Sequence, residues 1–343
     1  MAGATQLSGF MLLAFFLGLG LLTSASRPLS NDSSMVKKHE DWMVQYGRTY
    51  KDNAEKVMRF EIFKKTVEFI EAHNRLNKGY TLSVNAFADL TDEEFRKTYT
   101  GYKRQEPSNS SLKSTSFKYK NFTDVPSSVD WVTAGAVTPI KNQGTCGSCW
   151  AFASVATIES LNEITTGNLI SLSEQEILDC DVNGEDHGCN GGFADGAYQF
   201  VINNGGLTTE DNYPYVGYQE NYCNGNDPAA VTISGYENVP NNDESSMQQA
   251  VANQPITVVL DASDDGFRYY SGGVFTGPCG TATDHVVTVV GYDTASDGTP
   301  YWLIKNSWGT SWGENGYIRL QRDVSDPRGL CGVAMYPAYP TNN

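Results

Sequence analysis

Cysteine is missing from the first 145 of the 343 residues, and all seven cysteines of the chain follow from Cys146 onward. Disulfide bonds can therefore stabilise the later part of the chain but not the early part. An odd number of cysteines also leaves at least one thiol unpaired. The two parts are thus expected to be stabilised by different means.

Basic residues are scarce in the later part of the chain. Residues 1–124 carry 18 Lys and Arg against 14 Asp and Glu, whereas residues 125–343 carry 6 against 26, within a net charge of −16. An acidic body offers no basic face for phosphates, so nucleic acid is not expected as a partner. The opposite signs, +4 and −20, suggest that the early part sits on the later part and loosens when acid protonates the carboxylates.

Apolar runs long enough to cross a membrane are missing as well, so no membrane partner is expected. The run Phe10–Leu22 has 13 residues and is followed by the small residues Thr23, Ser24 and Ala25. This pattern predicts a signal peptide over residues 1–25, although no Lys or Arg precedes the run. The protein is therefore expected in the secretory pathway, bound for a vacuole or lysosome-like compartment or for the outside of the cell, where disulfides form.

The early part is expected to be helical and to end in a linker. Residues 39–74 show helical periodicity, with Trp42, Tyr46 and Tyr50 recurring every four residues. Residues 104–124 are rich in Ser, Lys and Asn, which predicts an exposed, cleavable linker. N-glycosylation sequons, which indicate exposed loops of a glycoprotein, begin at Asn31, Asn109 and Asn121.

The later part changes from a helical to a β-rich character. Trp150–Ile164 is an apolar run with helical periodicity, and a second helix is expected after Ser173, which can cap it. Short β-rich runs follow from about Ala230, and they include Ile256–Leu260, Val286–Val290, Tyr301–Ile304 and Gly316–Leu320. A helical lobe followed by a β lobe is the α+β arrangement, in which ligand sites often lie between the lobes.

Two chemistries are open for Cys146 and Cys149, which stand three positions apart. A C-x-x-C dithiol would be a thioredoxin-type redox site, but such a site needs a preceding parallel strand, and a polar turn stands there instead. Alternatively, Cys146 is a half-cystine and Cys149 is a nucleophile at the N-terminus of a helix. The helix dipole and the free N–H groups at that end favour the thiolate, which is the reactive form of the thiol.

A nucleophilic thiol needs a base, and the chain has four histidines. His39 and His73 lie in the cysteine-free part, and His187 lies in a Gly-rich loop. His285 heads a strand-like run, which is a rigid placement suited to a general base. The sequence therefore favours His285 as the partner of Cys149.

Three further side chains would complete such a site. The carboxamide of Asn306 could accept the other ring N–H of His285 and fix the orientation of the imidazole. Trp308 could keep water away from that hydrogen bond. The side-chain NH₂ of Gln143, together with the backbone N–H of Cys149, could stabilise a developing oxyanion.

These residues, in this order, resemble the papain family of cysteine proteases, and especially its plant members. The matching motifs are Gln143–Phe152, Gly188–Gly192, Asp284–His285 with the apolar run after it, and Asn306–Gly313. The resemblance extends from about residue 39 to the C-terminus. It implies a papain-like two-lobe α+β fold for a mature peptidase of residues 125–343, with a helical left lobe at about 134–236 and a β-barrel-like right lobe at about 237–343.

Residues 26–124 resemble the inhibitory propeptide of this family. Two propeptide motifs are matched, at Glu55, Arg59, Phe63, Ile70 and Asn74 and then at Asn85, Phe87 and Asp89. Thr66 and Ser83 depart from the family's Asn and Gly, which leaves the local turn or capping there open. The resemblance implies a zymogen that the propeptide closes at neutral pH and that is cut in acid at or near Val125.

The resemblance also implies a disulfide pattern and a set of substrate-binding residues. The pairs would be Cys146–Cys189, Cys180–Cys223 and Cys279–Cys331, which leaves Cys149 free. The backbone at Gly191 and Gly192 would pair with an extended substrate. The remaining substrate-binding positions would be Phe193, Ala194, Val259, Thr283, Asp284, Val286, Trp308 and Tyr336. Most of these line an apolar pocket with Tyr336 at its floor, which predicts an apolar preference two residues before the cut.

The sequence thus predicts an endopeptidase that hydrolyses peptide bonds through a Cys149 thiolate and a His285 imidazolium, with Asn306 and Gln143 assisting. Its expected partners are protein and peptide substrates, its own propeptide and cystatin-type inhibitors. A monomer without cofactor or metal is expected. The alternative is a binding or storage protein that kept the fold and lost the chemistry, which the presence of Gln143, Cys149 and His285 disfavours.

Overall fold

The computed structural model describes residues 29–102, 117–182, 186–225 and 227–342. The chain divides into two compact units, Met1–Arg48 and Thr49–Asn343. Helix α1, Leu29–Gln45, belongs to the first unit and is followed by a turn in which Gly47 has a φ of 61°. The predicted signal peptide, the sequon at Asn109 and most of the predicted linker lie outside the described residues.

The helical pattern predicted over residues 39–74 is split between two helices. Helix α1 ends at Gln45, and helix α2 spans Asn53–Asn74. The second helix begins where the side chain of Asp52 accepts a hydrogen bond from the amide of Glu55, at 2.8 Å. An N-cap of this kind starts a new helix, and the periodicity of the aromatic residues did not reveal the break.

The remaining early elements are short. Strand β1 spans Tyr80–Leu82, and helix α3 spans Asp92–Tyr99. A capping box starts α3, because the side chain of Thr91 accepts from the amide of Glu94 while the Glu94 side chain accepts from the amide of Thr91. Strand β2, Val129–Asp130, follows near the predicted mature N-terminus.

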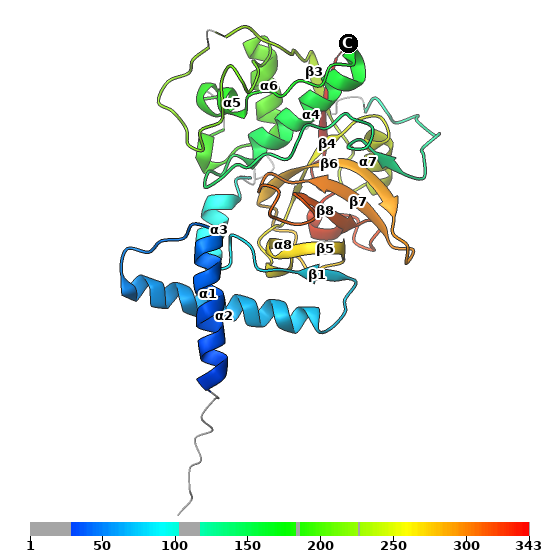
Figure 1. The fold of residues 1–343 in the computed structure, drawn as a ribbon. Coiled ribbons are helices and arrows are strands. Elements are labelled where there is room, and N and C mark those ends of the chain that lie inside the picture. The colour runs from blue at the N-terminus through cyan, green and yellow to red at the C-terminus, as the bar shows by residue number, and fades with distance from the viewer. Residues whose placement is uncertain (1–28, 103–116, 183–185, 226, 343) are drawn as a thin grey trace, which may run out of the picture. The chain divides into compact units, whose positions relative to one another are not determined.

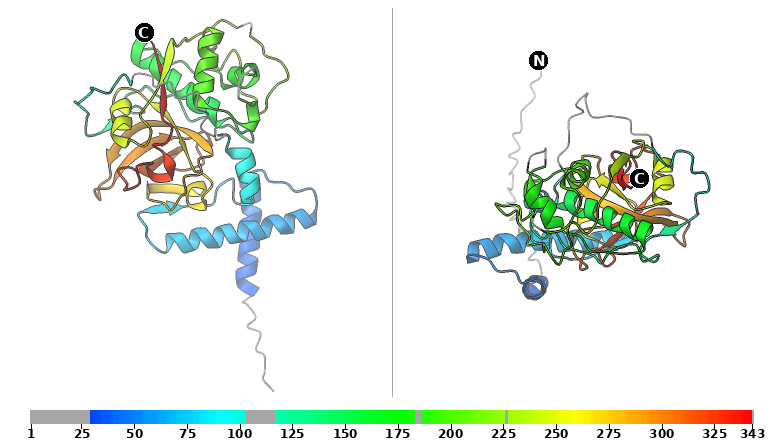
Figure 2. Two further views of the ribbon diagram at one scale, coloured as in Figure 1. Left: turned by 180° about the vertical axis from the view of Figure 1, so that it is seen from behind. Right: turned by 90° about the horizontal axis from the view of Figure 1, so that it is seen from above.

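The first helices of the later part gather in one lobe, as Figures 1 and 2 show in green. They are α4, Cys149–Thr166; α5, Glu174–Cys180; the 3₁₀ helix η1, Gly188–Asn190; and α6, Ala194–Asn204. Helix α4 is buried along Cys149–Leu161, which agrees with its mostly apolar sequence. Ser173 caps α5 by accepting from the amide of Glu176 at 2.9 Å, as predicted.

The other lobe is built on a mostly antiparallel sheet whose order is β1-β5-β8-β7-β6-β4-β9-β3, with β2 paired to β6. Its strands are β3, Gly235–Asn238; β4, Ile256–Leu260; β5, Tyr270–Phe275; β6, His285–Thr294; β7, Pro300–Lys305; β8, Tyr317–Gln321; and β9, Ala338–Thr341. The helices α7, Glu244–Val251, and α8, Asp265–Arg268, and the 3₁₀ helix η2, Leu330–Gly332, complete this lobe. The four β-rich runs predicted from the sequence lie in these strands, except for Gly316, which precedes β8.

The sheet contains strands from both the early part and the later part of the chain. Strand β1 pairs antiparallel with β5, with Tyr80 opposite Gly273. The early segment thus adds a strand to the edge of the later lobe. No helix among the described residues is long and apolar enough to cross a bilayer.

Candidate active site

The structure contains three disulfide bonds, Cys146–Cys189, Cys180–Cys223 and Cys279–Cys331. These are the pairs that the resemblance implies, and Cys149 is left free. Because Cys146 is bonded to Cys189, it does not form a dithiol pair with Cys149. The geometry therefore disfavours the thioredoxin-type interpretation of Cys146 and Cys149.

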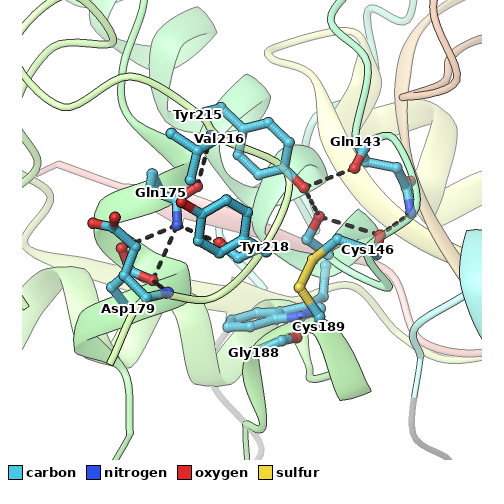
Figure 3. The surroundings of a disulfide bond; sticks show 12 residues. Gln143, Cys146, Gln175, Asp179, Gly188, Cys189, Tyr215, Val216 and Tyr218 are labelled. Carbon is cyan, nitrogen blue, oxygen red and sulfur yellow. Dashed lines mark hydrogen bonds between the residues drawn. A yellow bond between two sulfur atoms is a disulfide. The ribbon is translucent and has the colours of Figure 1, made fainter. Parts of the chain in front are cut away.

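Figure 3 shows how the Cys146–Cys189 disulfide and its neighbours hold the loop that precedes α4. The hydroxyl of Tyr215 donates to the carbonyl of Gln143 and lies 2.8 Å from the hydroxyl of Ser148. Cys149 is the first residue of α4, and Ser148 makes no side-chain cap there. The loop therefore presents Cys149 at the N-terminal end of the helix, where N–H groups favour an anion.

Strand β6 brings His285 beside Cys149. The amide of Val286, the next residue of the strand, donates to the Cys149 sulfur at 3.5 Å. The Nε2 atom of His285 lies 2.8 Å from Oδ1 of Asn306, and the amide of Ser307 donates to the same oxygen at 2.8 Å. That oxygen is an acceptor, so His285 carries a proton on Nε2. Nδ1 of His285 has no hydrogen-bond partner among the described residues.

Trp308 covers the hydrogen bond between His285 and Asn306. Its ring stacks on the imidazole of His285, with 4.6 Å between centroids and an interplanar angle of 27°. Trp308 and His285 are both buried, at 4% and 0% exposure. The indole therefore keeps water away from this hydrogen bond, as the sequence suggested.

A buried polar chain links the strand that precedes Asn306 to the helix that begins with Cys149. The ammonium of Lys305 donates to the carbonyl and the hydroxyl of Thr138, both at 2.9 Å. The hydroxyl of Thr138 donates in turn to Glu159 of α4. Burial lowers the pKa of Lys305 to about 8. These contacts join strand β7 of one lobe to helix α4 of the other, and the sequence did not reveal them.

In this form of the protein, burial opposes charge on both reactive groups. The side chains of Cys149 and His285 are fully buried. Burial raises the pKa of Cys149 to about 12, against the effect of neighbouring amides, and it lowers the pKa of His285 to about 4. A neutral thiol beside a neutral imidazole is therefore favoured here, rather than the predicted thiolate and imidazolium.

The NH₂ group of Gln143, the predicted oxyanion donor, is occupied in this structure. It donates to the carbonyl of Cys146 at 2.8 Å and to the carbonyl of Tyr99 at 3.3 Å. The hydroxyl of Ser307 donates to Oε1 of Gln143, at 2.6 Å, and fixes which end of the carboxamide faces Tyr99. The indole N–H of Trp308 also donates to the carbonyl of Tyr99, at 3.1 Å. A backbone carbonyl of the early segment thus lies where these donors converge.

The next residues of the early segment occupy the predicted substrate-binding backbone. The amides of Gly101 and Tyr102 both donate to the carbonyl of Asp284, at 3.0 and 2.9 Å. The amide of Gly192 donates to the carbonyl of Gly101 at 2.9 Å, and Tyr102 forms a parallel bridge with Gly192. A Cβ atom on Gly101 would lie 1.9 Å from the carbonyl oxygen of Gly147, so only glycine fits at this point.

Two of the predicted pocket residues, Phe193 and Tyr336, lie near the ring of Tyr102. The ring of Tyr102 lies 5.7 Å from that of Phe193 and 6.4 Å from that of Tyr336, between centroids. Of the other predicted pocket residues, Val259, Thr283 and Val286 are buried and Ala194 is half-buried. Tyr336 is 41% exposed and so borders the pocket more than it closes the floor.

Aromatic packing anchors the early segment beside the site. Phe95 of α3 is fully buried, and its ring contacts that of Trp308 edge-on, with 5.4 Å between centroids. The guanidinium of Arg268 lies 4.2 Å above the ring of Phe95 and pairs with Asp92 at 3.0 Å. The sequence predicted a basic early part on an acidic later part. At this ion pair the charges are reversed, because the acidic Asp92 belongs to the early part and the basic Arg268 to the later part.

Within the early segment, Arg59 of α2 makes a two-pronged contact with Glu94 of α3, with both distances at 2.7 Å. It also donates to the carbonyl of Asp89 at 2.9 Å.

Thr66, which departs from the family pattern, is buried, and its hydroxyl lies 3.4 Å from the hydroxyl of Tyr269. No group of His, Cys, Asp or Glu in the described ranges has the arrangement of a metal site.

Comparison with known proteins agrees with this organisation. The sequence-family model of the papain family cysteine proteases matches residues 125–341. The sequence-family model of the cathepsin propeptide inhibitor domain (I29) matches residues 39–95. The chain is 54% identical over 319 residues to the senescence-specific cysteine protease SAG39 of Oryza sativa subsp. indica, covering 92% of this chain and 93% of that protein. It is 51% identical over 326 residues to fruit bromelain of Ananas comosus, covering 93% and 90%.

Solved proenzyme structures have the same fold. The recombinant stem bromelain precursor superposes with a TM-score of 0.83 at 48% identity, covering 90% of this chain and 99% of that one. The proform of the ragweed pollen allergen Amb a 11 superposes with a TM-score of 0.84 at 40% identity, covering 91% and 96%. The early segment is therefore an inhibitory propeptide. The chain belongs to the papain family of cysteine proteases, whose members hydrolyse peptide bonds, and it is a proenzyme of that family.

Proposed function

We propose that Cys149 is the nucleophile of this protease and His285 its general base and acid. The observation that carries this proposal is the placement of one free cysteine at the start of α4, beside a histidine whose Nε2 is held by Asn306. Removal of the propeptide would return water to both side chains. Hydration and the N-terminus of α4 then favour a thiolate beside an imidazolium.

The proposed reaction proceeds through a thioester. The Cys149 sulfur attacks the peptide carbonyl, and Gln143 with the Cys149 amide stabilises the oxyanion. His285 gives its proton to the leaving amine. It then removes a proton from water, which hydrolyses the thioester and frees the sulfur. Asn306 keeps the imidazole ring in one orientation through both steps.

We further propose an apolar preference at the residue two positions before the cut. Phe193, Val259 and Val286 supply buried apolar surface, and each methylene that a substrate buries there would contribute about 0.8 kcal/mol. The propeptide presents Tyr102 to the same wall, which supports an apolar or aromatic occupant. A substrate library tested on the trimmed protease checks this preference, and equal cleavage after charged and apolar residues would contradict it.

The zymogen is proposed to mature by cleavage at or near Val125 in acid. Its destination, in a vacuole or outside the cell, and the use of Asn121 for glycosylation are proposed on sequence grounds. Asn121 is exposed, as a glycosylated residue must be. Inhibition by cystatin-type proteins and a monomeric state are proposed on the same grounds.

Thiol labelling and one substitution test the assignment of Cys149. Iodoacetamide should label one thiol rapidly in the trimmed protease and none rapidly in the full chain, because the propeptide buries the sulfur. Cys149→Ser should abolish peptide hydrolysis while the three disulfides remain intact. Hydrolysis of casein by the Cys149→Ser protein would show that the nucleophile is another residue.

A further inference from the structure

The two proposed oxyanion donors stand at the two ends of one short loop. The side chain of Gln143 is one donor, the amide of Cys149 is the other, and residues 144–148 lie between them. Such donors lower the barrier only when both already point to the place where the negative charge develops. Any group that fixes the two ends of this loop relative to each other therefore acts on the transition state.

The hydroxyl of Tyr215 contacts both ends of the loop. It donates to the carbonyl of Gln143 at 2.8 Å, as Figure 3 shows, and it lies 2.8 Å from the hydroxyl of Ser148, the residue before Cys149. A carbonyl oxygen can only accept, so the Tyr215 proton is used at Gln143, and Ser148 must be the donor in the other bond. The hydrogen bonds thus run in one direction, from Ser148 through Tyr215 to Gln143.

Tyr215 is itself held in place by other parts of the helical lobe. Its ring packs edge-on against Phe152 of α4, with 4.8 Å between centroids and an interplanar angle of 82°. Its amide donates to the carboxylate of Glu210 at 2.9 Å. These partners all belong to the later part of the chain. Removal of the propeptide therefore leaves the contacts of Tyr215 intact.

Other backbone contacts of the loop hold one end at a time. The amide of Gln143 donates to the carbonyl of Ser307 at 2.8 Å, which fixes the first end against the β lobe. The amide of Gly147 donates to the carbonyl of Cys189 at 3.0 Å, which fixes the second end beside the disulfide. The Tyr215 hydroxyl differs from these groups because a single atom joins both ends.

We propose that Tyr215 is a positioning residue that sets the spacing between the Gln143 side chain and the Cys149 amide for binding the oxyanion. The inference rests on the proposed function, because that function makes these two groups the oxyanion donors. Tyr215 acts through the backbone of Gln143 and the hydroxyl of Ser148, and a residue that supports the reacting groups in this way improves their alignment.

Tyr215→Phe tests the proposal because it removes the hydroxyl and keeps the ring that packs on Phe152. The carbonyl of Gln143 then loses this donor, and the Ser148 hydroxyl is left with the carbonyl of Cys146, at 3.4 Å. Tyr213→Phe is the matched control. It removes a hydroxyl from the same segment, but that hydroxyl donates to Asp179 of α5 at 2.8 Å instead of to the loop.

The kinetic experiment measures kcat and KM for a dipeptidyl substrate after acid trimming of the full chain. In Tyr215→Phe, kcat should fall roughly tenfold while KM stays within about twofold, because the oxyanion forms only in the transition state. In Tyr213→Phe, both should stay within about twofold of the wild type, because only packing in the lobe is affected. An unchanged kcat in Tyr215→Phe, or an equal fall in both variants, would overturn the proposal.

Alkylation of Cys149 by iodoacetamide separates the oxyanion donors from the thiol. This reaction forms no oxyanion, so its rate in trimmed Tyr215→Phe should stay within about twofold of the wild type. An alkylation rate that falls as far as kcat would show that Tyr215 acts on the thiol and not on the donors.

A double-mutant cycle with Gln143→Ala tests whether Tyr215 acts through Gln143. Tyr215→Phe should lower kcat much less in the Gln143→Ala background than in the wild type, because the donor to be positioned is already missing. If Gln143→Ala itself has normal turnover, the proposed function is wrong about the oxyanion. If Gln143→Ala is impaired and Tyr215→Phe has the same effect in both backgrounds, only the present inference fails.

Hydrogen exchange on the full chain at neutral pH does not depend on catalysis. The amides of Gly147 and Ser148 are hydrogen-bonded within the fold and should exchange several-fold faster in Tyr215→Phe than in Tyr213→Phe, because the loop opens more often. Equal exchange in the two variants would contradict the proposal. If Tyr215→Phe does not fold, Ser148→Ala, which breaks the same chain of hydrogen bonds at its other end, takes its place in every measurement.

Discussion

Replacing Gly101 by alanine should make the proenzyme leak activity at neutral pH. The Cβ atom of an alanine would lie 1.9 Å from the carbonyl oxygen of Gly147 and 2.5 Å from its carbonyl carbon. Both atoms belong to the backbone beside Cys149, so the neighbour cannot swing away as a side chain could. The propeptide must therefore move outward at this point.

The size of the leak follows from the contacts that this movement breaks. The hydrogen bonds from Gly101 and Tyr102 to Asp284, and from Gly192 to Gly101, have lengths of 3.0, 2.9 and 2.9 Å. Each contributes about 1 kcal/mol net, so their loss weakens closure by up to about 3 kcal/mol. The open form should then be up to roughly a hundredfold more populated than in the wild type.

The assay compares full-length proteins before any trimming. The initial rate of dipeptidyl substrate hydrolysis at neutral pH is measured while gels confirm that the chain is intact. Lys97→Ala is the matched control, because Lys97 is an exposed residue of α3 in the same propeptide. If acid trimming removes residues 26–124 as proposed, all three proteins become the same protease and should have the same kcat/KM. A Gly101→Ala proenzyme as latent as the wild type would refute the steric reasoning.

Three further predictions concern the oxyanion donor, the aromatic anchor and the acid response. Gln143→Ala should lower the kcat of the trimmed protease by roughly two to three orders of magnitude, because about 3 to 4 kcal/mol of barrier lowering is lost, and turnover near that of the wild type would contradict its role. Phe95→Ala should remove about 3 to 5 kcal/mol of packing and make the full chain more active at neutral pH than Gly101→Ala does, which the same substrate assay measures. The hydrogen bonds of Arg59 lower the pKa of Glu94 to about 2. The ionised Glu94 carboxylate therefore stabilises the fold above the ordinary pKa of a glutamate, and this stabilisation is lost as pH falls toward about 2. Glu94→Gln should therefore lower the melting temperature of the full chain near pH 7, and by calorimetry this difference should shrink as pH falls below the ordinary carboxyl pKa toward about 2.

Much of the later part could be predicted because its signals are local. The apolar run after Cys149, the cap at Ser173 and the β-rich runs each specify one element, and the structure contains all of them. The start of a helix at Cys149 and of a strand at His285 could be predicted for the same reason. That Cys149 rather than Cys146 is the free cysteine needed the disulfide pattern, since the two residues stand only three positions apart.

The contacts that the sequence did not reveal are long-range or lie in irregular segments. Strand β1 has three residues, and its partner β5 lies far along the chain, so no periodicity indicates it. Tyr99, Gly101 and Tyr102 lie next to a polar linker and carry no signal that they contact the site. Asp186 follows other polar residues in a loop and resembles a solvated charge, whereas the fold buries it against Gly192.

The propeptide closes the site at several points that work together. The backbone of Gly101 and Tyr102 is hydrogen-bonded to the backbone of Asp284 and Gly192. The carbonyl of Tyr99 accepts hydrogen bonds from the side chains of Gln143 and Trp308. Burial adds a second effect, because it opposes both the thiolate of Cys149 and the imidazolium of His285. Loosening the contact at Gly101 alone would leave the Tyr99 carbonyl and the packing of Phe95 in place. We therefore expect full activity only when α3 also leaves its place on Trp308, because the contact of Phe95 with Trp308 holds the propeptide beside His285.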